Sequence, residues 1–122
     1  ILLIEDNDDL RFYLKDNLKQ NFHIIEAVNG KDGWQKTLAM HPDLVVSDIA
    51  MPEMNGLDLC TKIRHDERTA HTPIILLTAL SDKADLLAGT ECGANDYITN
   101  PFKSEILLSK INVILLVLLI IL

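Results

Sequence analysis

Cysteine and basic residues are scarce in this sequence of 122 residues. Its two cysteines, Cys60 and Cys92, show neither CxxC nor Cys/His spacing, so neither a zinc site nor a disulfide framework is indicated, and we expect two buried thiols in a reducing compartment such as the cytoplasm. Eleven Lys and Arg against 18 Asp and Glu leave a formal net charge of −7. That balance disfavours direct contact with nucleic acid.

Short apolar runs alternate with amphipathic stretches of helix length. Between the runs, apolar residues recur at every fourth position, as at Leu10, Leu14 and Leu18, which is typical of a helix with one buried face. Strand and helix therefore alternate, and we expect a doubly wound parallel α/β sheet of five strands with five helices on its two faces. The expected strands are residues 1–4, 23–27, 43–47, 74–77 and 96–98.

Acidic residues follow two of the expected strands. Glu5 and Asp6 come directly after the first strand, and Asp48 follows the third. Because ligands of such sheets bind beyond the carboxyl ends of the strands, a pairing of these two strands would bring the three carboxylates together. Oxygen ligands on rigid strand ends suit Mg²⁺. From spacing alone, solvated acidic residues at loop starts are an equally good interpretation.

Four motifs at the ends of the first, third, fourth and fifth expected strands give the sequence a family resemblance. They are Ile4-Glu5-Asp6-Asn7, the segment from Ser47 to Gly56, Leu77-Thr78-Ala79 and Asn100-Pro101-Phe102. In this order and spacing, residues 1–112 resemble the CheY-like receiver domain of two-component response regulators. The resemblance implies a flavodoxin-like fold with strand order 2-1-3-4-5 and a role in a phosphorelay.

The resemblance also implies an aspartyl-phosphate switch. Asp48 matches the residue that accepts a phosphoryl group from a histidine kinase, its phosphodonor partner. Glu5, Asp6, Asp48 and the backbone carbonyl of Ala50 match the Mg²⁺ ligands. Thr78 matches the hydroxyl residue that contacts the phosphoryl group. The small side chain of Ala79 matches an open approach to the site, and Tyr97 matches the aromatic switch residue on the fifth strand. Asn55 and Gly56 match a structural turn, and Pro101 matches a proline whose preceding bond is often cis.

One position departs from the family pattern. Family members carry a lysine immediately before Pro101, whereas this chain has Asn100. Asparagine carries no charge, so a phosphorylated Asp48 would lose a charge-assisted contact. We therefore expect Mg²⁺ binding to persist and the coupling of phosphorylation to output to weaken. The alternatives are a pseudo-receiver that only docks partners and a phosphatase. The phosphatase is disfavoured, since Ala50 leaves no second carboxylate two residues after Asp48.

The end of the chain is unusually apolar. Residues 113–122 are all Val, Ile or Leu, and we expect them to extend the last helix beyond the receiver unit of residues 1–112. As a helix they would measure about 15 Å, half of a hydrocarbon core, so no membrane span is expected. They could form a homodimer contact, continue as a signalling helix, or be foreign to the natural protein.

The wider context of the domain is also an expectation from the sequence. The absence of Met before Ile1 and the Asp66-Glu67-Arg68-Thr69 run suggest a receiver from a hybrid sensor histidine kinase. In such a protein a kinase would lie upstream, a helix-turn-helix output often follows, and the receiver would belong to the cytoplasmic part of a membrane-bound sensor.

Overall fold

A computed structural model describes residues 1–78, 91–99 and 103–121 of the chain. Five strands and four helices lie in these ranges. In chain order they are β1 (Leu2–Ile4), α1 (Asp8–Leu18), β2 (Ile25–Ala27), α2 (Gly30–Met40), β3 (Val45–Asp48), α3 (Gly56–Arg64), β4 (Ile74–Thr78), β5 (Asp96–Thr99) and α5 (Ser104–Ile121). The strands agree with the expected ones to within one or two residues at each end.

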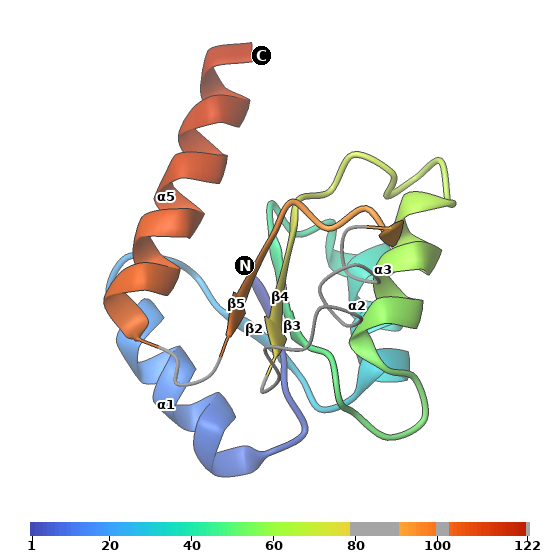
Figure 1. Cartoon of the computed structure of the whole chain (residues 1–122), viewed down its shortest axis with the longest axis horizontal. Coiled ribbons are helices and arrows are strands. Elements are labelled where there is room, and N and C mark those ends of the chain that lie inside the picture. The colour runs from blue at the N-terminus through green and yellow to red at the C-terminus, as the bar shows by residue number, and fades with distance from the viewer. Residues whose placement is uncertain (79–90, 100–102, 122) are drawn as a thin grey trace.

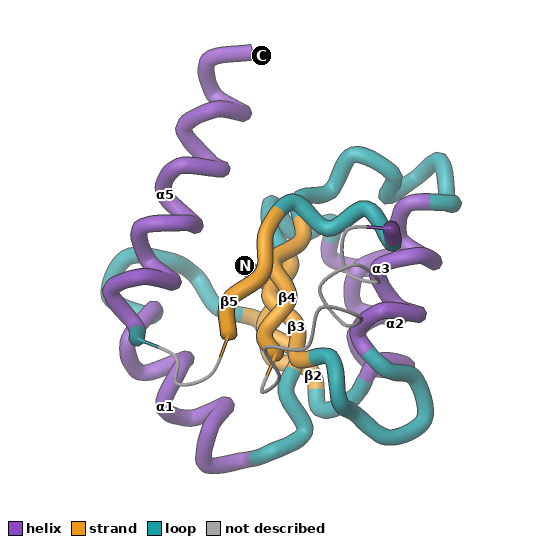
Figure 2. The backbone as a smooth tube through the Cα atoms, in the orientation of Figure 1, coloured by secondary structure: helices purple, strands orange, loops and turns teal. Residues whose placement is uncertain are grey.

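The strands form one parallel sheet in the order β2-β1-β3-β4-β5, which confirms the doubly wound topology expected from the sequence. Helices α1 and α5 lie on one face of the sheet, and α2 and α3 lie on the other (Figure 1). Figure 2 shows the strands as a central layer between these two helical layers. Four of the five expected helices are described, and most of the connection between β4 and β5 lies outside the described residues.

Successive strand residues supply two separate halves of the core. Leu2 and Ile4 of β1 join the cluster that packs against α2 and α3. Leu3, which lies between them, joins the cluster beneath α1 and α5. All three are fully buried. Because side chains alternate along a strand, a sheet covered on both faces needs such unbroken apolar runs, and this is why the runs predicted the strands.

Asparagine side chains fix where three of the helices begin. Asn7, Asn29 and Asn55 each have an extended backbone, and their Oδ1 atoms accept the backbone N–H three residues later. Each bond satisfies one of the free donors of the first helical turn. At the other end of α2, His41 adopts a left-handed conformation directly before Pro42, and the helix ends there. Asn7 and Asn55 therefore fix the points at which the loops of the candidate site end and α1 and α3 begin.

The two cysteines are free and buried, as expected. The Cys60 thiol on α3 donates to the backbone carbonyl of Cys92 over 3.3 Å. Burial raises the pKa of the Cys60 thiol. This thiol therefore behaves as a small core side chain.

Helix α5 has two different halves. Leu107 and Ile111 in its first half are fully buried against the sheet. Its second half projects beyond the body of the domain (Figure 1). Among the described residues, no helix is both long and apolar enough to cross a membrane.

Gly56 generates a prediction about the loop after β3. A Cβ atom at Gly56 would lie 2.2 Å from the backbone oxygen of Asp48, which cannot move without displacing β3. Replacing Gly56 by Ala should therefore lower the free energy of unfolding by about 1–3 kcal/mol, measured by urea denaturation. Gly33→Ala is the matched control, because the first atom its Cβ would meet is Cδ1 of Ile4, at the far end of a flexible side chain rather than in the backbone. An equal or larger loss in the control would contradict this explanation.

Candidate functional site

The pairing of β1 with β3 brings the predicted acidic residues to one edge of the sheet. Ile4 lies opposite Ser47, so one further step along both strands places Glu5 beside Asp48. Asp6 follows Glu5 in the loop that leads into α1. The sequence interpretation required this strand pairing as an assumption, and the structure confirms it.

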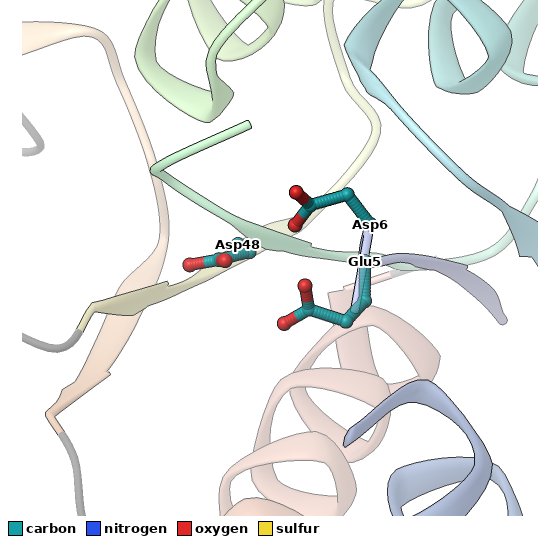
Figure 3. Close-up of side chains that lie close together, drawn as sticks. All are labelled: Glu5, Asp6 and Asp48. Atoms are coloured by element: carbon teal, nitrogen blue, oxygen red, sulfur yellow. The ribbon is translucent and has the colours of Figure 1, made fainter. Parts of the chain in front are cut away.

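Three carboxylates converge at this point (Figure 3). Glu5, Asp6 and Asp48 each offer an oxygen atom, and these three atoms all lie within 4.8 Å of one another. Asp6 is exposed, Asp48 is half-buried and Glu5 is only 1% exposed. The cluster therefore extends from solvent into the protein interior.

Glu5 is an unusual residue for the interior of a protein. Its Oε2 atom accepts the backbone N–H of Asn7 over 3.1 Å, while its buried Oε1 atom has no donor within reach among the described residues. Burial raises its pKa from 4.5 to about 8, and the nearby charges of Asp6 and Asp48 contribute in the same direction. In the absence of a cation, the folded protein therefore favours a protonated Glu5 at neutral pH.

Asp48 has a similar but less extreme environment. Burial is the main cause that raises its pKa, and the charge of Asp6 adds to it. Its Oδ1 atom accepts the backbone N–H of Ile49 over 2.8 Å, which opposes the rise by stabilising the charged form. This hydrogen bond also holds the carboxylate at the end of β3.

Arg11 forms no hydrogen bond with the carboxylates of the cluster in the described structure. Arg11 donates to the backbone carbonyl of Glu5 over 2.7 Å, and its guanidinium pairs with Asp8 at 2.5 Å and with Glu26 at 3.4 Å. Its charge is thus directed to the surface formed by α1 and β2.

Asn7 and Arg11 both support the Glu5 backbone or side chain, and sequence reasoning assigned a role to neither. An asparagine between an acidic pair and a helix is an N-cap signal that could have pointed to Asn7.

The donor set fits a hard divalent cation. It consists of oxygen atoms only, carries negative charge, and includes a buried oxygen to which none of the described residues donates, so that a cation could satisfy it. Mg²⁺ prefers such ligands and keeps several water molecules, which the exposed side of the cluster allows. Ala50 lies in the loop two residues after Asp48 with an exposed side chain. Its role as a backbone ligand is still a prediction.

The other predicted site residues lie on neighbouring strands. Thr78 is 3% exposed and ends β4, one residue after Leu77, the β-sheet partner of Asp48. Tyr97 on β5 is half-buried and packs against the cluster beneath α2 and α3. The strand order thus places Thr78 next to the strand of Asp48, and Tyr97 one strand further. Ala79, Asn100 and Pro101 lie outside the described residues.

Comparisons with known proteins identify the family of the chain. Residues 1–112 match the family described as the response regulator receiver domain. The chain is 43% identical over 102 residues to histidine kinase P4 of Formosa agariphila, covering 84% of this chain and 7% of that protein. It is 41% identical over 116 residues to the response regulator ArlR of Staphylococcus aureus, covering 94% of this chain and 52% of that protein. The chain therefore spans about half, or much less, of these curated relatives.

Solved structures show the same likeness. The receiver domain of a signal transduction histidine kinase from Syntrophus aciditrophicus superposes with a TM-score of 0.85 at 36% identity, covering 91% of this chain and 85% of that one. The chemotaxis protein CheY4 of Vibrio cholerae superposes with a TM-score of 0.85 at 25% identity, covering 91% and 93%. With the family match over residues 1–112, the strand order and the acidic cluster in agreement, this chain belongs to the family of response regulator receiver domains.

Proposed function

We propose that this receiver domain accepts a phosphoryl group on Asp48 from a phosphohistidine of a histidine kinase, with Mg²⁺ bound beside it. The observation that carries the proposal is the convergence of Glu5, Asp6 and Asp48, with one buried carboxylate oxygen that has no donor in the described part of the chain. A purely structural cluster would gain nothing from gathering three carboxylates, since their mutual repulsion and burial both cost free energy.

In this proposal Asp48 is the nucleophile. One of its carboxylate oxygens forms a bond to phosphorus while the bond from phosphorus to the donor imidazole nitrogen breaks, and the nitrogen keeps that electron pair. The half-buried position and the hydrogen bond from Ile49 hold the carboxylate in one orientation for this displacement. Glu5, Asp6, Asp48 and the backbone carbonyl of Ala50 would hold Mg²⁺, which when bound supplies positive charge against the carboxylates and the phosphoryl oxygens.

Thr78 and Tyr97 would form the switch that reads the phosphoryl group. The buried position of Thr78 at the end of β4, adjacent to the strand of Asp48, supports a role in contacting a phosphoryl oxygen. The half-buried ring of Tyr97, one strand further, supports a role as the group that repacks when Thr78 moves. A two-state packing change driven by one local charge is the general device of phosphorylation switches.

The wider protein is part of the same proposal. The chain matches only a part of histidine kinase P4 and of ArlR, which supports a receiver unit within a longer signalling protein. A kinase in the same chain, as in a hybrid sensor, is the arrangement we favour. The second candidate is a pseudo-receiver that docks a partner without productive phosphorylation, and the specific observation that favours it is Asn100 in the place of the family's lysine.

Phosphorylation can be tested with a small phosphodonor. Incubation with acetyl phosphate and MgCl₂ should add the mass of one phosphoryl group to the intact protein, because the donor needs only the nucleophile and the cation. Asp48→Asn should abolish the gain, and removal of Mg²⁺ with EDTA should reduce it at least tenfold. Asp58→Asn, an exposed carboxylate on α3 outside the cluster, is the matched control and should behave like the wild type. No gain in the wild type, with kinase binding retained, would favour the pseudo-receiver.

The acidic cluster also makes the stability of the metal-free protein depend on pH. The pKa of Glu5 is about 8 in the folded state against 4.5 ordinarily, so the folded state holds its proton more tightly than the unfolded state does. The contribution of this group is complete below about pH 4.5 and is lost as the pH rises towards 8. The melting temperature of the metal-free protein should therefore fall by several degrees across this window relative to Glu5→Gln, measured by calorimetry. Millimolar Mg²⁺ at pH 8 should restore it in the wild type alone. Parallel pH profiles for both proteins would refute this assignment.

Asn100 can be tested by restoring the positive charge. Asn100→Lys should leave Mg²⁺ affinity nearly unchanged, because the lysine would act on the phosphoryl group rather than on the metal. It should strengthen the conformational response to phosphorylation, measured as the change in tyrosine fluorescence or in amide exchange near Tyr97 on adding acetyl phosphate. If both proteins respond equally, the loss of the lysine has no effect on switching.

A further inference from the structure

The loop that follows Asp48 packs directly against the first turn of α2. Gly30, the first residue of α2, is buried, and a Cβ atom at this position would lie 2.1 Å from the backbone oxygen of Met54. It would also lie 2.8 Å from the carbonyl carbon of the same residue. Only a residue without a side chain allows two backbones to approach so closely. We call residues 49–55 the β3–α3 loop, and this loop lies against α2 because residue 30 is a glycine.

Space, and not backbone conformation, requires a glycine at this position. Among the described glycines only Gly93 has a positive φ angle, so the backbone of Gly30 is one that alanine also adopts. Alanine forms helices more readily than glycine, so the stability of α2 alone would favour alanine. The contact with Met54 is therefore the feature of the structure that explains the glycine.

The β3–α3 loop has little freedom to move away from an added side chain. The backbone carbonyl of Ile49 accepts the N–H of Gly56 over 2.8 Å, which closes the loop at its ends. Within the loop, Met54 donates its N–H to the carbonyl of Pro52 over 2.8 Å, and Glu53 between them has a φ angle of 68°. A left-handed residue directly after a proline leaves this turn few other conformations. A displacement of Met54 would therefore pass back along the loop towards its start.

Helix α2 cannot withdraw from the loop without a loss of packing. Its buried residues are Gly30, Gly33 and Thr37, so this side of the helix lies on the body of the domain. The hydroxyl of the fully buried Thr37 donates to the carbonyl of Gly33 over 2.7 Å. Because protein interiors are closely packed, moving α2 outward would open a void beneath these residues. An added side chain at residue 30 would therefore displace the loop rather than the helix.

The start of the β3–α3 loop belongs to the candidate metal site. Asp48 directly precedes the loop, and Ala50 is the residue whose backbone carbonyl is the predicted ligand of Mg²⁺. We propose that Gly30 is a positioning residue of the metal site, which holds the β3–α3 loop, and with it Ala50, where the loop can contribute to Mg²⁺ binding. Gly30 acts through the backbone of Met54. The inference rests on the proposed function and adds to it a residue outside the acidic cluster.

Titration of the whole chain with Mg²⁺ by isothermal calorimetry tests the proposal. Gly30→Ala should weaken Mg²⁺ binding at least tenfold, because groups that support the ligands of a metal commonly have effects of this size. Phosphorylation by acetyl phosphate gives an independent readout. Its half-saturating Mg²⁺ concentration should rise by the same factor. Its rate at saturating Mg²⁺ should stay within twofold of the wild type, because Asp48 is held by its own hydrogen bond from Ile49.

Two control variants separate positioning from a general loss of stability. Gly33→Ala makes the same change one turn later in α2, where the first atom met is Cδ1 of the flexible Ile4 side chain. Ile111→Val removes one methylene from the core on the other face of the sheet and should lower the melting temperature. Both variants should bind Mg²⁺ within twofold of the wild type. A tenfold loss in either control, or wild-type affinity in a folded Gly30→Ala, would overturn the proposal.

Amide hydrogen exchange of the wild type tests the same coupling without any substitution, so it serves even if Gly30→Ala does not fold. In the first turn of α2, the backbone N–H groups of Asp32 and Gly33 donate to Asn29 over 2.7 Å and 2.9 Å. If packing of the loop on α2 strengthens Mg²⁺ binding, Mg²⁺ must in turn strengthen that packing. Saturating Mg²⁺ should therefore slow the exchange of these two amides at least threefold and leave that of His41, at the other end of α2, unchanged. Unchanged exchange in the first turn would refute the inference.

These measurements distinguish the inference from the proposed function. If the wild type binds Mg²⁺ and Gly30→Ala binds it equally well, only the inference fails. If the wild type binds no Mg²⁺, the metal site of the proposed function fails, and the inference fails with it. If Mg²⁺ binding depends on Gly30 but acetyl phosphate adds no mass to the protein, the inference stands and the phosphorylation of Asp48 fails.

Discussion

The parallel hydrogen bonding between β1 and β3 is the constraint on which the candidate site depends. It aligns Ile4 with Ser47, and so forces Glu5 and Asp48 to leave the sheet side by side. The two strands are fixed by fully buried residues on both faces, so the carboxylates cannot separate without opening the core. A rigid sheet edge thus imposes an arrangement that the charged groups by themselves would avoid.

The electrostatic strain of this arrangement has only partial compensation from the described residues. Glu5 accepts one backbone N–H, and its other, buried oxygen has no donor within residues 1–78, 91–99 and 103–121; Asp48 accepts the backbone N–H of Ile49. The guanidinium of Arg11 instead supports the backbone of Glu5 and the surface acids. The uncompensated negative charge of the cluster therefore favours the binding of a cation or of a proton. The raised pKa of Glu5 reflects its affinity for a proton. In a receiver site that binds Mg²⁺, the metal relieves the repulsion between the carboxylates, and this relief adds to the affinity for the metal.

Much of the fold could be predicted because its signals are local. Apolar runs too short for helices predicted the strands. The recurrence of apolar residues at every fourth position, as at Leu10, Leu14 and Leu18, predicted a helix. Strand ends were less certain. Asp48 was expected to follow the third strand, yet it forms the last pair of β3 with Leu77, because an end is set by the partner strand. The burial of Glu5 could not be predicted, since an isolated glutamate is ordinarily exposed and only the packing around it excludes water.

The sequence by itself determined the alternation of strands and helices, the identity of the acidic residues and the apolar character of the final helix, because each is written in residue type and spacing. Only the tertiary structure decided that oxygen atoms of Glu5, Asp6 and Asp48 meet within 4.8 Å, that one of these oxygens is buried with no donor among the residues the structure describes, and which side chains of α5 are exposed. These properties depend on which strands pair and which faces pack. Such contacts join residues more than 40 positions apart in the chain, as between Ile4 and Ser47, and a linear pattern does not record them.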